Sequence, residues 1–373
     1  MIDDPSAPPS QISRQSVTAG SQTARVQLFH GAGRAFELRS IPLPETLAPG
    51  EVLVEISLAT ICGSDLHTIE GRRSSPTPGV LGHEAVGFVV ASARPGVLPG
   101  QRITWTLADS CGQCPACTDD QLPQKCVSLF KYGHTSLANG SGLNGGYASH
   151  IVLRAGTAVF EVPAELSDAV VAPANCALAT IVNVLSNLSD PCRSALVQGG
   201  GILGIYACAM LKRAGVEPVY CCDLSERRLE LISEFGGIPL RADPAQWPAA
   251  EQQLRMQSGG GIDLVIEVAG APEAVPQGVR VLRPGGTYVW AGMVHPETRL
   301  ALTGEEVVRK CLRIRGVHNY APPDLEAALR FLAEAHLQFP FHKLVSPPFP
   351  LERLDEAIAV AQRREWLRVA VRP

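Results

Sequence analysis

The sequence lacks any apolar run close to the ~18 residues that a membrane-spanning helix needs. It also lacks a hydrophobic signal core, because its first residues are polar. Neither sign of charge dominates, since 32 Lys and Arg stand against 36 Asp and Glu. The resulting net charge of −4 gives no basic field to attract nucleic acid. These absences predict a soluble, cytoplasmic protein with no membrane and no nucleic-acid partner.

The length and the local composition predict the domain organisation. A chain of 373 residues exceeds the ~250–300 residues that one hydrophobic core usually serves, so we expect two domains. Residues 1–24 are rich in Pro, Ser and Gln and contain almost no large apolar side chain. They predict a disordered lead-in.

Two types of fold follow the lead-in. Residues 25–173 contain short alternating strands, such as 51–57 and 85–91, separated by Gly and Pro, which predicts a β-rich, barrel-like domain. Residues 174–316 alternate apolar strands with helices, which is typical of a doubly wound parallel sheet. Residues 317–373 return to mixed structure and are assigned to the first domain. The predicted fold class is therefore α/β with a second, β-rich domain.

The eleven cysteines are clustered in a way that argues against a disulfide framework. Four of them occur as Cys111-Gly-Gln-Cys114-Pro-Ala-Cys117 and, after eight further residues, Cys126. Cys-x2-Cys turns bring sulfurs to one point, and four thiolates complete the tetrahedral shell of one Zn²⁺. Because no coordination position remains for a substrate, we predict that this zinc site is structural.

A glycine-rich turn with the spacing of a dinucleotide-binding site lies in the second half of the chain. It follows the apolar strand 194–198 and opens a predicted helix over 202–214. In such a turn, glycines allow a tight bend, close approach of the pyrophosphate and packing of helix on strand. The positive end of the helix then faces the phosphates. The predicted cofactor-binding residues here are Gly199, Gly201, Ile202, Leu203 and Gly204.

An acidic residue bears on the choice of nucleotide. Asp223 ends the next predicted strand, 218–223, where a carboxylate accepts the ribose hydroxyls of NAD and repels a 2′-phosphate. Arg227 and Arg228 follow soon after and could assist a phosphate. NAD is the predicted cofactor, contacted by Asp223 and Arg228, and NADP is the less favoured alternative.

A second set of metal-ligating residue types suggests another zinc site, with one position left open. Its candidates are Cys62, His83 and, as the third ligand, Cys176. Taken singly, each is equally compatible with a buried structural residue. The polar residues beside Cys62 and His83, in an otherwise apolar stretch, favour the metal site.

These motifs, in this order, resemble the zinc-containing medium-chain alcohol dehydrogenases over about residues 25–373. The resemblance rests on the Cys-Gly-Ser-Asp-Leu-His run, the Gly-His-Glu triplet, the four-cysteine lobe and the nucleotide fold. It implies a GroES-like catalytic domain, a Rossmann domain, two Zn²⁺ per chain and a homodimer or homotetramer. One departure is visible, because eight residues separate Cys117 from Cys126 where seven is usual. We expect the loop to absorb the extra residue.

The resemblance also implies roles around the open metal site. Cys62, His83 and Cys176 would be the catalytic zinc ligands, and the substrate would take the fourth position. Glu84 would lie behind the metal and approach it during ligand exchange. Asp65 would orient His83 through a hydrogen bond.

Three further roles concern the proton and the cofactor. By resemblance, Ser64 would receive the proton of the alcohol, and His67 would pass it to solvent through the nicotinamide ribose. Arg368, in the predicted last strand 367–371, would reach the pyrophosphate. The implied reaction transfers hydride between NAD(H) and an alcohol–carbonyl pair.

Two adjacent arginines bear on the substrate. The spacing between His67 and His83 matches the family without gaps, which places Arg72 and Arg73 over the substrate cleft. A guanidinium group suits carboxylate, phosphate or phosphonate, and this run resembles family members associated with phosphonate metabolism. An anionic, hydroxyalkylphosphonate-type substrate is therefore predicted, unless both side chains point to solvent.

Three alternatives remain open at this point. The enzyme could be a polyol or threonine-type dehydrogenase with an uncharged or zwitterionic substrate. It could be a metal-free quinone or enoyl reductase, which would not need the three zinc ligands. It could also be a non-catalytic nucleotide-binding protein, against which the presence of Ser64 and His67 argues.

Overall fold

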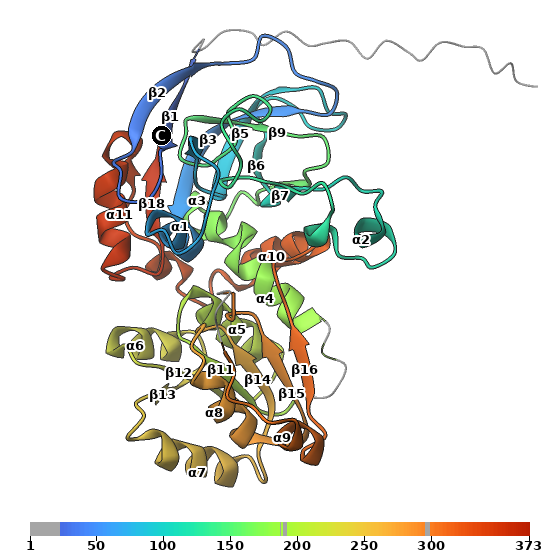
Figure 1. The fold of residues 1–373 in the computed structure, drawn as a ribbon, viewed down its shortest axis with the longest axis vertical. Helices are drawn as coiled ribbons and strands as arrows, with labels where there is room; N and C mark the ends of the chain where they lie inside the picture. The colour runs from blue at the N-terminus through green and yellow to red at the C-terminus, as the bar shows by residue number, and fades with distance from the viewer. Residues whose placement is uncertain (1–22, 187, 189–191, 295–298) are drawn as a thin grey trace, which may run out of the picture.

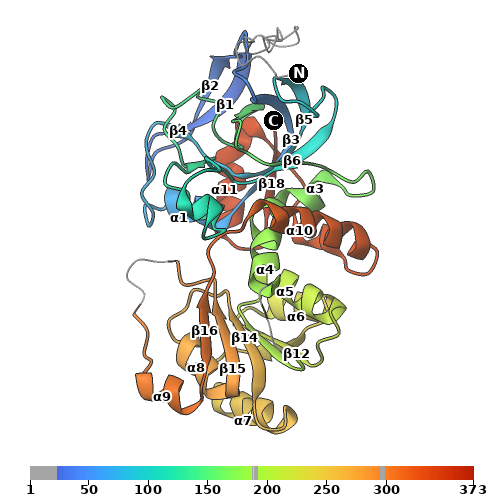
Figure 2. The same ribbon diagram turned by 90° about the vertical axis from the view of Figure 1, so that its right-hand side faces the viewer.

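The computed structural model describes residues 23–186, 188, 192–294 and 299–373, which form two lobes (Figures 1 and 2). Helices α4 (Ala177–Ser186) and α10 (Pro322–Ala335) lie where the lobes meet. Of the predicted lead-in, residues 1–22 lie outside the described residues. Its last two residues were assigned wrongly, because strand β1 begins at Thr23 and Ala24 is fully buried.

The lower lobe contains a six-stranded sheet whose strands are all parallel, in the order β13-β12-β11-β14-β15-β16. This order places two βαβαβ halves back to back, so the direction of winding reverses between β11 and β14. The predicted doubly wound sheet is confirmed. Its strands are β11 (Ala195–Gln198), β12 (Val219–Asp223), β13 (Ile238–Arg241), β14 (Ile262–Glu267), β15 (Leu282–Trp290) and β16 (Arg313–Gly316).

Helices cover both faces of this sheet (Figure 2). On one face Val197 packs in the same buried cluster as Ile205, and on the other Leu196 packs in the cluster of Leu254. Successive residues of a strand are thus buried on opposite faces of the sheet. This explains why the sequence of each strand is a continuous apolar run. The helices are α5 (Ile202–Arg213), α6 (Glu226–Glu234), α7 (Trp247–Gln257), α8 (Ala274–Val281) and, beyond the sheet, α9 (Gly304–Arg309).

The upper lobe is built from a seven-stranded sheet and two smaller ones. The large sheet runs β10-β6-β5-β3-β18-β17 with β9 beside β3, and the small sheets are β2-β1-β4 and β7-β8. This is the β-rich domain that the sequence predicts. Its strands are β1 (Thr23–Phe29), β2 (Glu37–Pro42), β3 (Val52–Ile61), β4 (Gly79–Val80), β5 (Glu84–Ser92), β6 (Arg102–Trp105), β7 (Ala108–Asp109), β8 (Phe130–Lys131), β9 (His150–Leu153), β10 (Val159–Glu161), β17 (Phe349–Pro350) and β18 (Val369–Arg372).

Short helices join the strands of the upper lobe. They are α1 (Gly63–Ile69), α2 (Pro115–Thr118), α3 (Asp168–Val171), α11 (Leu354–Gln362) and the 3₁₀ turns η1 (Pro123–Lys125), η2 (Ala172–Asn175), η3 (Phe341–Leu344) and η4 (Leu351–Arg353). Among the described residues, no single helix has the length and apolar composition to cross a membrane. The segment Asp168–Asn175 and α4, bent by 55°, meet that criterion only as a pair.

Sheet membership changes between β10 and β11 and changes back between β16 and β17. The chain therefore leaves the upper lobe, builds the lower one and returns to add its last strands. The domain limits 25–173, 174–316 and 317–373 stay predictions.

The large sheet of the upper lobe brings three strand ends together. In the antiparallel pair β3 and β5, Thr60 lies opposite Glu84, and in the pair β3 and β18, Ile61 lies opposite Val369. The residues just beyond these positions must therefore be neighbours, although they come from the first and the last parts of the chain. Figure 1 shows α1, which follows β3, at the edge of the upper lobe nearest the lower one.

Candidate metal centres and active site

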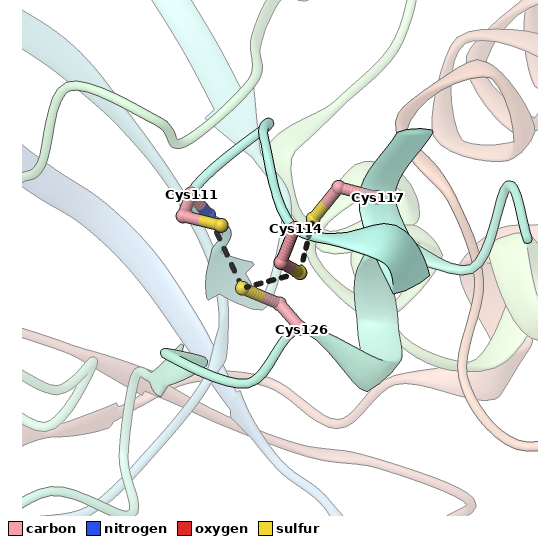
Figure 3. A group of neighbouring side chains, drawn as sticks. All are labelled: Cys111, Cys114, Cys117 and Cys126. Carbon is pink, nitrogen blue, oxygen red and sulfur yellow. Dashed lines mark hydrogen bonds between the residues drawn. The ribbon is translucent and has the colours of Figure 1, made fainter. Parts of the chain in front are cut away.

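The four cysteines of the predicted structural site turn toward one another (Figure 3). Their sulfurs all lie within 4.8 Å of one another, with Cys114 Sγ 3.5 Å from Cys117 Sγ and 3.9 Å from Cys126 Sγ. Zn–S bonds of ~2.3 Å in a tetrahedron require sulfurs ~3.8 Å apart. The segment between Cys117 and Cys126 contains the end of α2 and η1, so the extra residue is absorbed by short helical turns. The donor set fits a closed Zn²⁺ site.

The three predicted catalytic ligands also come together. Cys62 Sγ lies 4.0 Å from Cys176 Sγ, and both belong to a group with His83 and Glu84 whose ligand atoms lie within 4.8 Å of one another. Cys62 and His83 are buried, with 7% and 3% of their surface exposed. Two thiolates and an imidazole are a donor set that Zn²⁺ prefers, and they leave one of four positions open.

The local sequence explains how Cys62 is held. It is the N-cap of α1, with extended backbone angles (φ −86°, ψ 155°) directly after β3. Its backbone N–H donates to Asp65 Oδ2 at 2.9 Å, as in a capping box. Within four residues, the Cys-Gly-Ser-Asp run therefore ends a strand, starts a helix and brings the thiol within 4.0 Å of Cys176 Sγ.

Cys176 approaches Cys62 and His83 from the segment between η2 and α4. It follows η2 and precedes α4, and its carbonyl accepts a hydrogen bond from Thr180 N at 3.1 Å. One buried cluster runs from Leu58 and Val86 in the upper lobe through α4 to Val197 in the lower sheet. Packing of this cluster fixes the position of Cys176 relative to the first two ligands.

Asp65 lies against His83, but the contact is not the hydrogen bond that the resemblance implies. Its Oδ1 is 3.3 Å from His83 Nδ1, and neither atom has a hydrogen-bond partner of acceptable geometry. The other oxygen accepts from Tyr147 OH at 3.0 Å, so the fully buried carboxylate is fixed in place. Burial lowers the pKa of His83, yet Asp65 and Cys62 outweigh it and raise that pKa to about 10. Asp65 thus favours the protonated ring, and its role in orienting His83 stays a prediction.

Gly82 makes room for this arrangement. Its φ of +89° is in the left-handed region, and a Cβ there would lie 2.8 Å from Tyr147 Cδ1. The Gly-His pair therefore allows the Tyr147 ring to pack beneath the backbone while its hydroxyl reaches Asp65.

Glu84 and Arg368 form a buried ion pair behind the catalytic ligands. Arg368 Nε and Nη2 donate to the two Glu84 oxygens at 2.7 and 2.8 Å, and Thr60 Oγ1 donates to Glu84 Oε2 at 2.6 Å. Burial raises the pKa of Glu84 to about 7, although Arg368 opposes the shift. Arg368 Nη2 also lies 3.4 Å from Cys62 Sγ. The sequence did not predict this use of Arg368, and its contact with a pyrophosphate stays a prediction.

The two proposed proton carriers lie on α1. Ser64 Oγ is 3.5 Å from His83 Nε2, so it stands beside the side of the imidazole that a metal would take. Ser64 and His67 are both half-buried. The geometry places Ser64 next to the open coordination position, and the relay through His67 stays a prediction.

The glycine-rich turn links β11 to α5 as predicted. Gly201 is the N-cap of α5, with Ile202 and Leu203 in the first turn, and nothing lies within 4 Å of the position of its missing Cβ. A Cβ on Gly204 would lie 1.9 Å from the Gly199 carbonyl oxygen. One glycine therefore leaves space above the helix end, and the other allows the helix to pack on the strand.

Asp223 stands at the end of β12, beside this turn. Its Oδ2 accepts from Gly200 N at 2.8 Å and lies 3.3 Å from Arg228 Nη1. The carboxylate is thus oriented over the turn. Arg228 is held by Asp223, in an ion pair that leaves a quarter of the arginine side chain exposed.

The two predicted substrate arginines differ in environment. Arg72 is exposed and forms an ion pair with Glu70. Arg73 is half-buried, its backbone N–H donates to His67 O at 3.1 Å, and no described residue pairs with its guanidinium. Of the two arginines, only Arg73 combines partial burial with a guanidinium that has no partner among the described residues.

Sequence reasoning missed four residues of the site: Thr60, Lys131, His134 and Tyr147. His134 stacks obliquely on His83, with ring centroids 5.4 Å apart. The polar run that contains Lys131 and His134, directly after the four-cysteine lobe, was a signal that could have found them. Thr60 and Tyr147 look like ordinary strand and loop residues in the sequence.

Removal of one catalytic ligand tests the two-site assignment. For Cys176→Ser we expect zinc to fall from two to one per chain and activity to fall more than about 100-fold, since even outer-shell changes cost 10–100-fold. Elemental analysis of the purified protein measures the metal. The exposed Cys311 gives the control Cys311→Ser, which should keep both ions. Two zinc ions in Cys176→Ser would contradict the assignment.

Removal of Arg368 tests the buried ion pair. For Arg368→Leu we expect the free energy of unfolding to fall by about 3–5 kcal/mol, because Glu84 loses its buried partner and must take up a proton or stay unpaired in the interior. Arg372, exposed at the end of β18, gives the control Arg372→Leu, for which a change within about 0.5 kcal/mol is expected. Urea denaturation followed by tryptophan fluorescence compares them. Equal losses in the two variants would show that the pair adds nothing.

Comparison with known proteins agrees with this architecture. Residues 48–164 match the family model "Alcohol dehydrogenase GroES-like domain", and residues 203–334 match "Zinc-binding dehydrogenase". A probable D-xylulose reductase A from Aspergillus fumigatus is 29% identical over 86% of this chain and 88% of its own length. L-threonine 3-dehydrogenase from Streptomyces avermitilis is 29% identical over 80% of this chain and 85% of its own.

A solved structure gives the same result. The crystal structure of an alcohol dehydrogenase from Thermotoga maritima superimposes with a TM-score of 0.88 at 26% identity, covering 95% of this chain and all of that one. Both lobes are therefore shared, together with the order in which the chain builds them. The chain belongs to the zinc-containing medium-chain alcohol dehydrogenase family.

Proposed function

We propose that the protein is a zinc-dependent dehydrogenase that transfers hydride between NAD(H) and an alcohol–carbonyl pair. The observation that carries the proposal is the incomplete centre Cys62–His83–Cys176, with Ser64 Oγ 3.5 Å from the imidazole. A closed metal site would offer no position to a substrate, whereas this centre keeps one free. The glycine-rich turn after β11 would bind the second reactant, the dinucleotide.

Each residue of the centre has a separate role in the proposed reaction. Zn²⁺ held by Cys62, His83 and Cys176 would supply a Lewis acid that acidifies the substrate hydroxyl. Ser64 Oγ accepts the hydroxyl proton, and His67 passes it toward solvent. The lobe interface keeps water from the carbon that loses hydride.

Other residues hold these groups in position. Asp65 and Tyr147 fix the imidazole of His83, so that its Nε2 faces the metal position. The Glu84–Arg368 pair lies behind Cys62, and Arg368 stabilises the thiolate at 3.4 Å. These groups keep the centre preorganised while the substrate and the cofactor come and go.

NAD rather than NADP is proposed as the cofactor. Asp223 Oδ2 lies over the turn, bonded to Gly200 N, where it would accept the adenosine-ribose hydroxyls. In that position the carboxylate of Asp223 would repel the 2′-phosphate of NADP. Arg228 is the residue that could favour NADP, but its guanidinium already pairs with Asp223.

An anionic, hydroxyalkylphosphonate-type alcohol is proposed as the substrate, with Arg73 as a recognition residue. The half-buried, unpaired guanidinium of Arg73 supports this, whereas Arg72 is left out because it pairs with Glu70 on the surface. A polyol or threonine-type substrate is the second candidate. The similarity to a D-xylulose reductase and to an L-threonine 3-dehydrogenase supports it. A homodimer or homotetramer is proposed by family likeness alone.

A pair of glycine variants tests the nucleotide site. Gly201→Ala should fill the empty space above α5, raise the Kd for NADH about 10-fold and change stability by at most about 1 kcal/mol. Gly204→Ala should instead destabilise the fold by about 1–3 kcal/mol, because its Cβ would clash with Gly199 O. Fluorescence titration and thermal denaturation separate the two effects. Unchanged NADH binding by Gly201→Ala would place the pyrophosphate elsewhere.

A second pair of variants tests the substrate class. With NAD and 2-hydroxyethylphosphonate we expect Arg73→Ala to lower kcat/KM about 10–100-fold, the loss of one hydrogen bond to a charged group. With an uncharged alcohol of similar length it should change kcat/KM less than threefold. Arg72→Ala, the neighbouring control, should behave like the wild type on both. Equal losses on both substrates, or faster turnover of sorbitol or threonine than of the phosphonate, would favour the second candidate.

A further inference from the structure

We propose that Lys131 and Arg73 form an anion-binding subsite beside the open metal position, with His134 as an additional hydrogen-bond donor. The subsite would hold a compact dianionic oxyanion, such as a phosphonate or phosphate group, at the end of the alcohol remote from the reacting carbon. This inference rests on the proposed function for its place in catalysis, but the binding itself can be measured without turnover.

The backbone brings the two cations together from separate segments. Lys131 ends β8 and lies opposite Ala108 of β7. The loop that carries Arg73 runs beside the segment that follows Lys131, because Leu137 N donates to Pro78 O at 2.9 Å and Gly79 pairs with Ser136. The same loop is tied to α1 by the bond from Arg73 N to His67 O. The Arg73 backbone is thus held beside α1, the helix that carries Ser64, and the segment after Lys131 runs along the same loop.

The charges around Lys131 point to a missing anion. No described carboxylate forms an ion pair with Lys131, and it is half-buried. Burial and then Arg73 lower its pKa, whereas the opposing influences come from Cys176, Cys62 and Asp65. The negative groups that raise the pKa of Lys131 therefore belong to the catalytic centre.

Metal binding makes the deficit of negative charge larger. Two thiolates match the charge of one Zn²⁺, so the thiolates of Cys62 and Cys176 would no longer compensate Lys131 and Arg73. The remaining carboxylate, Asp65, is fully buried and already accepts two hydrogen bonds. Two neighbouring cations without a counter-charge repel each other, and a bound dianion would relieve that repulsion.

His134 adds an unpaired polar group to the same place. Both of its ring nitrogens are buried and have no hydrogen-bond partner among the described residues. An imidazole carries at least one N–H in either protonation state, so His134 offers an unpaired donor here. A buried unpaired donor costs about 1–3 kcal/mol, which a ligand oxygen would recover.

Further basic groups line a cleft between the lobes. A cavity of about 760 Å³ is lined there by Lys125, His318, Arg315 and Trp290, among others. Lys125 Nζ lies 2.7 Å from His318 Nδ1, which ties the four-cysteine lobe to the loop after β16. Burial, Lys125, Lys131 and Arg73 lower the pKa of His318 to about 4. Lys125, Arg315 and His318 thus give this cleft a basic lining in a chain whose net charge is −4.

The anionic group of the substrate takes no part in the bonds that break and form. The carbinol C–H bond breaks and its hydride passes to the nicotinamide, which is reduced. The hydroxyl proton leaves through Ser64, and a carbonyl forms. The phosphonate group keeps all its bonds, so its role is to bind and orient, which fits two fixed cations at a distance from the reacting carbon.

Calorimetry with methylphosphonate, which has no hydroxyl to oxidise, tests the subsite on the zinc-loaded protein. We expect methylphosphonate to bind the wild type, and Lys131→Met to weaken binding at least 10-fold. Lys131→Arg should largely restore it. Lys343→Met is the control, because Lys343 is exposed and pairs with Glu234. The uncharged ester dimethyl methylphosphonate should not bind.

The results separate this inference from the proposed function. Equal binding of methylphosphonate by the wild type and Lys131→Met, or no binding by the wild type, would overturn the subsite even if alcohols are oxidised. Binding that depends on Lys131 in a protein that oxidises no alcohol would support the subsite and overturn the proposed function. If Lys131→Met does not fold, Arg73→Ala takes its place, and equal binding of methylphosphonate by Arg73→Ala and the wild type would overturn the subsite.

Discussion

The catalytic centre depends on one buried ion pair. Glu84 has no exposed surface, so its charge must be compensated inside the protein, and Arg368 does this with two hydrogen bonds. The two residues are 284 positions apart: Glu84 begins β5 and Arg368 directly precedes β18, and these two strands lie on either side of β3. The pair therefore joins the beginning and the end of the chain at the point where Cys62 leaves β3. It also brings a guanidinium to the thiolate of Cys62, so that the same contact closes the fold and prepares a metal ligand.

The two cysteine-containing sites obey different constraints. In the four-cysteine lobe every donor comes from within sixteen residues, so a short segment with two helical turns completes the site by itself. The open centre draws its donors from three distant segments, and its geometry is set by β3, β5 and α4 together. A local site can hold a metal tightly without the rest of the fold. A distributed site can leave a position free because the surrounding packing, rather than a fourth ligand, keeps the donors in place.

Local patterns predicted much of this structure. Strand–turn–helix order predicted the nucleotide lobe, and residue types with the family resemblance singled out the two groups of side chains that the structure brings together. The pattern failed where partners are remote: the Arg368–Glu84 pair and the Tyr147–Asp65 bond exist only after the sheets form. The start of the fold was placed two residues late because Thr23 and Ala24 carry no large apolar group. Ala24 is buried by its partners in the small sheet, not by its own hydrophobicity.

The charges near the open position also rank the substrate classes. A site with fixed, partly buried cations rejects a ligand that leaves them unpaired, because their desolvation is then not repaid by any contact. A neutral polyol would leave both Arg73 and Lys131 in that state. A zwitterion such as threonine could offer its carboxylate to one cation, but its ammonium group would approach the other and repel it. A dianion satisfies both at once. The family relationship permits all three classes, and the electrostatics of Lys131 and Arg73 favour the last.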